Sequence, residues 1–99
     1  MKILAFTDIH GSLGAIRRVG KKVKYQKPDL LVCAGDISVF EESIFTIFKK
    51  LKNLGKKIIM IHGNHEDAST FLKYSKRSSN IIFIHKKHFV FENVLFLGF

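Results

Sequence analysis

Three short stretches of this sequence bring together carboxylate, amide and imidazole side chains at spacings that could do chemistry. They are Asp8-Ile9-His10, Gly35-Asp36 and Gly63-Asn64-His65-Glu66. Each stretch follows an apolar run, and polar side chains at the end of a buried strand need a polar partner. A metal ion or a phosphate is a better partner for such groups than a hydrocarbon core is. The three stretches therefore predict a binding site for a metal ion or a phosphate.

The apolar runs Ile3–Phe6, Leu30–Ala34 and Ile58–Ile61 predict the strands that position these side chains. In open α/β sheets, ligands lie outside the carboxyl ends of parallel strands, so three such strands would bring their polar ends into one crevice. Asp8 and His10 are two residues apart, so on an extended strand end both side chains should face one ion. The glycines before Asp36 and Asn64 permit a sharp turn and a close approach of the backbone to a ligand.

Between these strands, apolar residues recur at helical spacing. A helix over residues 12–26 is expected, and a second helix should begin at the capping box formed by Ser38 and Glu41 and end at Gly55. The phenylalanines of this second helix share the face that must pack on the sheet, so we expect them to be core residues and not a base-stacking platform. Alternation of strand and helix predicts a parallel βαβαβ sheet with helices against its faces.

The sequence pattern after the third motif differs from the strand–helix alternation before it. A short helix is permitted from Ala68 to Tyr74, and residues 80–84 predict a fourth strand. His88–Phe91 and Val94–Leu97 then predict a β-hairpin closed by a short polar turn. Phe99 ends the chain within strand-like sequence, which would leave an apolar unpaired edge. We therefore expect residues 1–99 to form one domain that is C-terminally truncated, and to self-associate or pair with a separate C-terminal half.

Composition narrows the class of protein. The 99 residues are 46% hydrophobic, which suits one small domain with a core of its own. There is no signal peptide and no apolar run near the ~18 residues of a membrane helix, so a cytoplasmic protein without a membrane partner is expected. The single cysteine, Cys33, fits a reducing compartment and is interpreted as a core residue. The net charge of +9 favours anionic partners, but it does not indicate sequence-specific nucleic-acid recognition.

Aspartate, asparagine and histidine together suit Mn, Fe, Zn, Ni or Co better than Ca or Mg. A carboxylate shared by two such ions, a bridging hydroxide and a nearby acid are the requirements of two-metal phosphoester hydrolysis.

With D-x-H, G-D and G-N-H-E in this order, the chain resembles the calcineurin-like metallophosphoesterase superfamily over almost its whole length. The resemblance implies the N-terminal half of an α/β/β/α sandwich that hydrolyses a phosphomonoester or phosphodiester with two divalent ions, of which we favour Mn. It implies that Asp8 and His10 hold the first ion, that Asp36 bridges both ions and that Asn64 holds the second. It also implies that His65 stabilises or protonates the leaving oxygen without binding metal.

The sequence departs from the family pattern in one respect. The family completes its site with a Gly-His and a Gly-His-x-His motif from later strands, and neither motif is present here. His85 and His88 are not expected to replace them, because both fall in a predicted solvent-exposed turn. His62 is interpreted as a packing residue whose polar atoms are satisfied. We therefore expect this chain alone to be a poor enzyme.

Taken singly, each of these polar residues could have a purely structural role. Asp8 or Asp36 could cap a helix, and Asn64 could be a turn residue. A second hypothesis is a basic nucleic-acid-binding module that keeps the fold, whose binding would fall steeply with salt but ignore chelators. Gly11-Ser12-Leu13-Gly14 is neither a dinucleotide fingerprint nor a phosphate loop. A cyclic nucleotide, a nucleic-acid end, a phosphoprotein and a small phosphodiester all remain open as substrates.

Overall fold

A four-stranded parallel sheet forms the centre of the molecule in the computed structural model, which describes residues 1–40, 43–64 and 66–99. The strands lie in the order β1-β2-β3-β4, the same as their order along the chain, with the bounds β1 (Ile3–Phe6), β2 (Leu30–Cys33), β3 (Ile58–Met60) and β4 (Ile81–Phe83). In the register, Phe6 pairs with Cys33, Cys33 with Met60 and Met60 with Phe83. The carboxyl ends of all four strands are therefore level, as a shared site requires.

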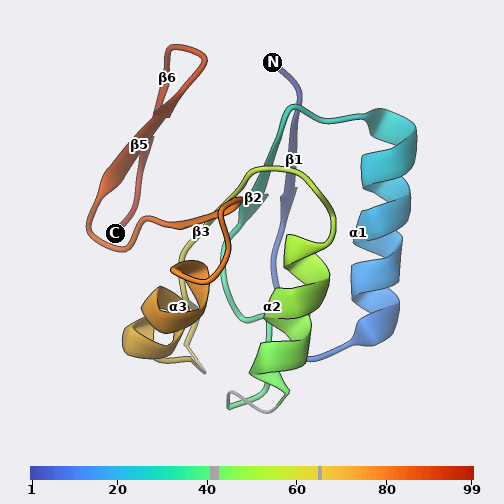
Figure 1. Ribbon diagram of the computed structural model, residues 1–99, viewed down its shortest axis with the longest axis vertical. Helices are drawn as coiled ribbons and strands as arrows, with labels where there is room; N and C mark the ends of the chain where they lie inside the picture. Colours follow the sequence, from blue (N-terminus) through green and yellow to red (C-terminus); the bar gives the residue numbers. More distant parts are fainter. Residues whose placement is uncertain (41–42, 65) are drawn as a thin grey trace.

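Three helices, α1 (Leu13–Gln26), α2 (Ile44–Lys52) and α3 (Ala68–Ser75), cover one face of this sheet (Figure 1). The expectation of helices against both faces is wrong. Right-handed crossovers that all step in the same direction place every helix on the same side, and the strand order here makes each crossover step the same way. None of the described helices is long and apolar enough to span a membrane.

The bounds of α1 confirm the predicted helix over residues 12–26, and the Ser12 hydroxyl accepts a hydrogen bond from the Ala15 amide at its N-terminus. The prediction for α2 is wrong at its start. This helix begins at Ile44, and its N-cap is Ser43. Ser38 is fully buried and lies outside the helix, and its hydroxyl donates a hydrogen bond to the Glu66 carboxylate. Glu41 lies outside the described residues.

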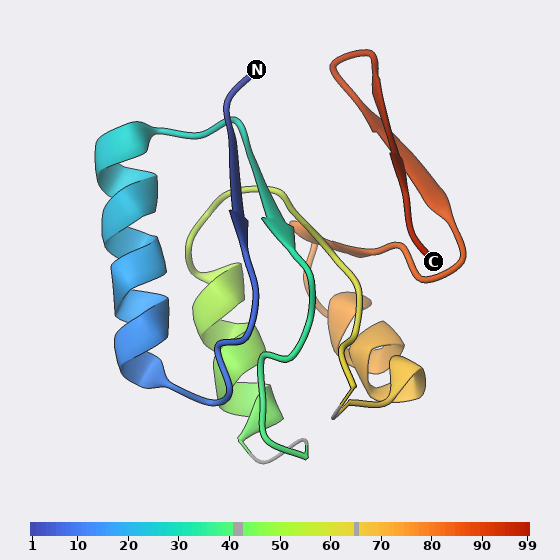
Figure 2. The same ribbon diagram turned by 180° about the vertical axis from the view of Figure 1, so that it is seen from behind.

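A β-hairpin of β5 (His88–Phe91) and β6 (Val94–Leu97) follows the sheet and has the predicted bounds. Its inner side chains, Phe89, Phe91 and Phe96, pack with Leu30, Ile59 and Ile84 on the face away from the helices. Figure 2 shows the strands in front of the helices and the hairpin to one side. The architecture is the predicted α/β arrangement, with a parallel sheet followed by an antiparallel hairpin.

Cys33 lies in the core at the end of β2 and is 1% exposed. Burial raises the pKa of its thiol to about 12, because the apolar surroundings disfavour the thiolate. The thiol is therefore neutral at ordinary pH, in agreement with its interpretation as a core residue.

Candidate metal centre

The loops that follow β1 and β2 run side by side at the carboxyl edge of the sheet. Their backbones are joined by hydrogen bonds from Asp8 N to Gly35 O (3.3 Å), from His10 N to Asp36 O (3.0 Å) and from Gly11 N to Ile37 O (2.8 Å). These bonds continue the pairing of the two strands beyond the regular sheet. They fix the positions of the side chains that the two loops carry.

The residues of the first two motifs with ligand-type side chains have left-handed backbone conformations, with φ of 60° at Asp8, 50° at His10 and 51° at Asp36. Such a conformation costs a residue with a side chain about 1–2 kcal/mol, and it persists only where the surroundings impose it. The hydrogen bonds between the loops supply that constraint. Residues in sparsely populated backbone regions are concentrated at functional sites.

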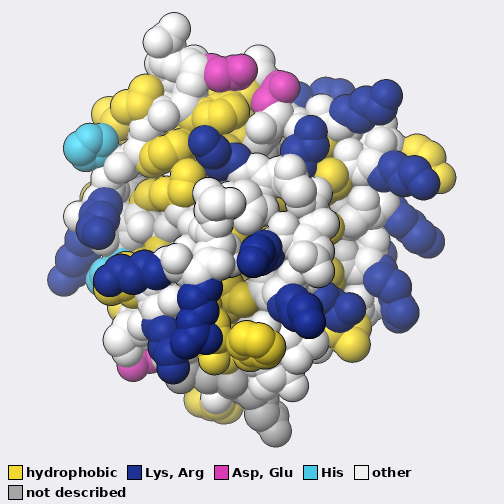
Figure 3. Space-filling view, viewed as in Figure 1, with side chains coloured by type: hydrophobic (Ala, Val, Ile, Leu, Met, Phe, Trp, Pro, Cys, Tyr) yellow, Lys and Arg dark blue, Asp and Glu magenta, His cyan; other side chains and the backbone are white. Residues whose placement is uncertain are grey.

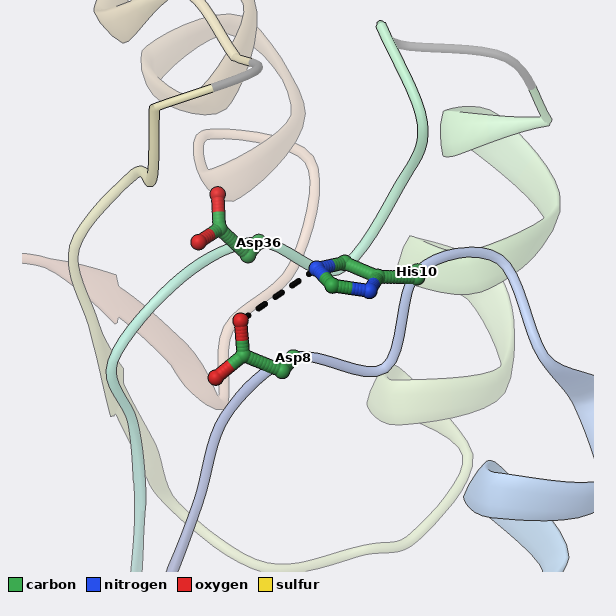
Figure 4. Close-up of side chains that lie close together, drawn as sticks. All are labelled: Asp8, His10 and Asp36. Atoms are coloured by element: carbon green, nitrogen blue, oxygen red, sulfur yellow. Dashed lines mark ion pairs between the residues drawn. The ribbon is translucent and has the colours of Figure 1, made fainter.

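The side chains of Asp8, His10 and Asp36 gather between the two loops (Figure 4). Each offers one ligand atom, and these atoms all lie within 4.8 Å of one another. His10 Nε2 is 3.2 Å from Asp8 Oδ1. The two side chains meet as predicted, but not because the chain is extended: both residues lie beyond the strand in the left-handed conformation.

The group is open to solvent on one side and closed on the other. The side chains of Asp8 and His10 are 54% and 47% exposed, so an ion and a substrate could reach them. Asp36 Oδ1 is instead buried, and none of the described residues donates a hydrogen bond to it. A buried carboxylate oxygen without a donor is costly. A cation beside it would remove that cost, so this donor set fits a divalent ion.

Two glycines allow the loop after β3 to approach the loop after β2. A Cβ atom on Gly63 would overlap the Asp36 carboxylate, and one on Gly35 would overlap the backbone of His62 and Gly63. The Gly35 backbone also has φ of +94°, which favours glycine. The predicted close approach is present, but the two loops make it with each other. The second and third motifs are therefore packed backbone against backbone.

Glu66 joins these two loops through its carboxylate. Its Oε1 accepts hydrogen bonds from the amides of Asp36 (2.9 Å) and Gly63 (3.0 Å), and its Oε2 accepts bonds from the amide and the hydroxyl of Ser38 (2.8 and 2.9 Å). Four donors on one carboxylate hold the backbone of Asp36 in place. No role for Glu66 was predicted from the sequence, although a carboxylate at the end of the third motif was a signal that could have prompted one.

Comparisons with known proteins agree with this geometry. The family model described as calcineurin-like phosphoesterase matches residues 1–98. The chain belongs to the calcineurin-like phosphoesterase family. Comparison with curated proteins found no match to this sequence.

Two solved structures share the fold of this phosphoesterase-family chain. One crystal structure superposes with a TM-score of 0.79 at 17% identity, over 92% of this chain and 49% of its own. The crystal structure of TT1561 of Thermus thermophilus superposes with a TM-score of 0.78 at 16% identity, over 91% of this chain and 44% of its own. The chain thus spans about half the length of these structures.

Asn64 and His65 are the other predicted site residues of the third phosphoesterase motif. Asn64 lies in an exposed turn directly after Gly63, the glycine that packs on the Asp36 carboxylate. Its assignment to a second ion stays a prediction. His65, predicted to act on the leaving oxygen, lies outside the described residues.

Three other histidines that the structure describes, His62, His85 and His88, are not part of the group of three. His62 packs as predicted, with its ring centroid 4.7 Å from that of His85 and 6.0 Å from that of Phe83. Its Nδ1 is buried without a hydrogen-bond partner among the described residues, so the expectation of a satisfied side chain is wrong. His85, which makes this ring contact, is half-buried, whereas His88 is exposed at the start of β5. The expectation of an exposed turn therefore holds for His88 and not for His85.

Proposed function

We propose that this chain is part of a metal-dependent phosphoesterase and that Asp8, His10 and Asp36 hold its first divalent ion. The observation that carries the proposal is the convergence of three ligand atoms within 4.8 Å, beside a buried carboxylate oxygen of Asp36 that has no donor among the described residues. The family supports the same chemistry, because its members are phosphoesterases.

In this proposal Asp36 would also contact a second ion, which Asn64 would help to hold, and manganese is the favoured metal among Mn, Fe, Zn, Ni and Co. Divalent ions held by these residues would supply an activated water and neutralise charge on the phosphate. His65 would donate a proton, or a hydrogen bond, to the oxygen that leaves phosphorus. The Glu66 carboxylate accepts a hydrogen bond from the Asp36 amide, so its proposed role is to position Asp36.

The proposed substrate is a phosphomonoester or a phosphodiester. The half-exposed side chains of Asp8 and His10 leave the outer side of the site open to it. We place the reaction in the cytoplasm, where the single thiol stays reduced.

We also propose that the site needs further histidines from a second copy of the chain or from a separate C-terminal half. The sequence contains neither histidine motif that the resemblance implies for later strands. With too few ligands the second ion would be poorly held, and two-metal catalysis depends on positioning. Hydrolysis of bis(p-nitrophenyl) phosphate with Mn²⁺ should be slow for the chain alone and should rise when a histidine-bearing half is co-expressed. Robust, chelator-sensitive turnover by the chain alone would contradict this.

Calorimetric titration with Mn²⁺ tests the metal site directly. The chain should bind the ion, and Asp36→Ala should lose most of that binding, because it removes the ligand nearest both proposed ions. Glu92→Ala, which removes an exposed carboxylate from the hairpin turn, is the matched control and should bind as the unmodified chain does. Equal uptake by the chain and by Asp36→Ala would overturn the proposal.

A further inference from the structure

A surface pocket between α2 and α3 lies outside the metal site. Its volume is about 270 Å³, just below the range of about 300–1,000 Å³ that is typical of small-molecule sites. It is lined by Phe45, Phe48, Lys49, Lys52, Tyr74, Arg77 and Ser78. None of these residues belongs to the three motifs. The pocket is large enough for one planar ring system and too small for an extended ligand.

Aromatic rings form the apolar part of this pocket. Tyr74 is stacked on Phe48, with centroids 5.3 Å apart, and lies 5.8 Å from Phe45. Phe48 is 3% exposed, as expected of a core residue, but Phe45 is 54% exposed. The expectation that the phenylalanines of the predicted second helix are core residues is therefore wrong for Phe45, and also for Phe40, which precedes α2 and is 74% exposed. The exposed ring of Phe45 is available to a ligand, with the half-buried ring of Tyr74 beside it.

Positive charge surrounds the rings. Lys49, Lys52 and Arg77 line the pocket, and Arg77 also lies over the Tyr74 ring, 5.5 Å from its centroid. No acidic residue is among the described residues that line it. Figure 3 shows that Lys and Arg side chains are spread across this helix-covered face, with Asp and Glu visible only near its margins. Charge complementarity therefore selects an anionic ligand with an aromatic ring.

We propose that this pocket binds one nucleotide unit of a single-stranded nucleic acid. The base would stack on Phe45 beside Tyr74, as bases stack on aromatic side chains in single-strand-binding proteins. The flanking phosphates would contact Lys49, Lys52 and Arg77. A strand fits better than a free nucleotide, because the positive surface continues beyond the pocket over α3. The proposal is independent of the metal site and should hold in the presence of a chelator.

Fluorescence anisotropy with a labelled short oligothymidylate, at low salt with EDTA present, tests the charges. The double variant Lys49→Glu, Lys52→Glu should weaken binding about 10-fold or more and lower the salt slope by about 1.4, the value for two lost phosphate contacts on a single strand. Lys21→Glu, Lys24→Glu on α1 is the matched control, with the same spacing, exposure and charge change. It should weaken binding no more than about 3-fold.

The stacking part is tested with Phe45→Ala, which should weaken binding about 10-fold by removing one ring. Tyr25→Ala, which removes a 78% exposed ring from α1, is the control and should have little effect. Circular dichroism checks that each variant is folded. Amide shifts in ¹H–¹⁵N NMR should change at Phe45, Tyr74 and Arg77 when the oligonucleotide is added.

A parallel titration with AMP distinguishes a nucleic-acid strand from a free nucleotide as the ligand of the pocket. Tighter binding of the oligonucleotide, with the same dependence on Phe45 and Lys49, supports a strand. AMP that binds equally well at the same residues overturns the strand in favour of a free nucleotide. Equal losses in the α1 and α2 charge variants, or NMR shifts away from the pocket, would show diffuse attraction to the net charge and overturn the pocket itself.

Discussion

The strand-end loops and the hairpin turn both contain non-glycine residues in the left-handed conformation, but for different reasons. In the hairpin these residues are Glu92 (φ 48°) and Asn93 (φ 66°), which form the two-residue connection between paired strands. Two central residues with positive φ are what a tight hairpin turn requires, and asparagine adopts them readily. The hairpin turn is thus determined by local sequence.

In the strand-end loops the same conformation occurs at Asp8, His10 and Asp36, where no local turn rule demands it. It is imposed by hydrogen bonds between the loops and by the Glu66 carboxylate, which lies 30 residues from Asp36 in sequence. The candidate site therefore depends on tertiary contacts, and the hairpin does not. Changes in contacts around the loops should alter metal binding, and changes in the hairpin should not.

The largest expected effect is at His65, the residue of the third motif that is predicted to act on the leaving oxygen. In a form of the protein that carries the complete set of metal ligands, His65→Ala should lower the rate of phosphodiester hydrolysis about 10²-fold or more, the usual loss for a positioned acid. Its metal content, measured by mass spectrometry, should not change. His88→Ala, at an exposed position in β5, is the control and should retain full activity. Loss of metal from His65→Ala would make this residue a ligand instead.

Glu66→Gln tests whether the Glu66 carboxylate positions Asp36. The amide group of glutamine would face backbone N–H donors that now bond to a carboxylate, so we expect Mn²⁺ to bind about 10- to 100-fold more weakly and the free energy of unfolding to fall by about 2 kcal/mol. Calorimetry and urea unfolding measure the two effects. Glu92→Gln in the hairpin turn should leave both unchanged. Unaltered metal affinity in Glu66→Gln would mean that the loops hold their shape without this carboxylate.

Gly63→Ala tests the contact between the second and third motifs. The new methyl group would overlap the Asp36 carboxylate, so that side chain or the loop must shift. We expect about 10-fold weaker Mn²⁺ binding, by analogy with other changes next to metal ligands. Gly14→Ala in α1 adds the same methyl group where it meets only ordinary contacts, and should stabilise the helix by up to about 1 kcal/mol. A Gly63→Ala protein with normal affinity would contradict the close packing of the two motifs.

The outer face of the hairpin should affect association and not chemistry. Val90, Leu95 and Leu97 are each more than half exposed. The double variant Leu95→Lys, Leu97→Lys should therefore remove any self-association of the chain, measured by sedimentation, and leave Mn²⁺ affinity unchanged. An assembly that persists in this variant would place the contact elsewhere.

The smallest effect is expected at the hairpin turn itself. Glycine adopts the positive φ of this position without steric cost, and asparagine already tolerates it well. Asn93→Gly should therefore change the free energy of unfolding by less than about 0.5 kcal/mol. Metal affinity should stay the same. A measurable change in Mn²⁺ binding would show that the hairpin and the strand-end loops are coupled.

Much of this molecule follows from its sequence. Apolar periodicity predicted α1, the buried strands and the bounds of β5 and β6, because these elements depend on local pattern and on turn residues. The three motifs predicted that Asp8, His10 and Asp36 would meet, because the carboxyl ends of neighbouring parallel strands share one edge.

Further features were decided only by the tertiary structure. Ser38 had the form of a helix cap, yet the Glu66 carboxylate binds its amide and hydroxyl in the folded chain, and α2 begins at Ile44 instead. Phe45 carries the helical spacing of a core residue but is more than half exposed beside Tyr74. The left-handed conformations at the candidate site arise from bonds between loops that are distant in sequence. Such contacts depend on which segments the fold brings together, and a local sequence pattern does not contain that information.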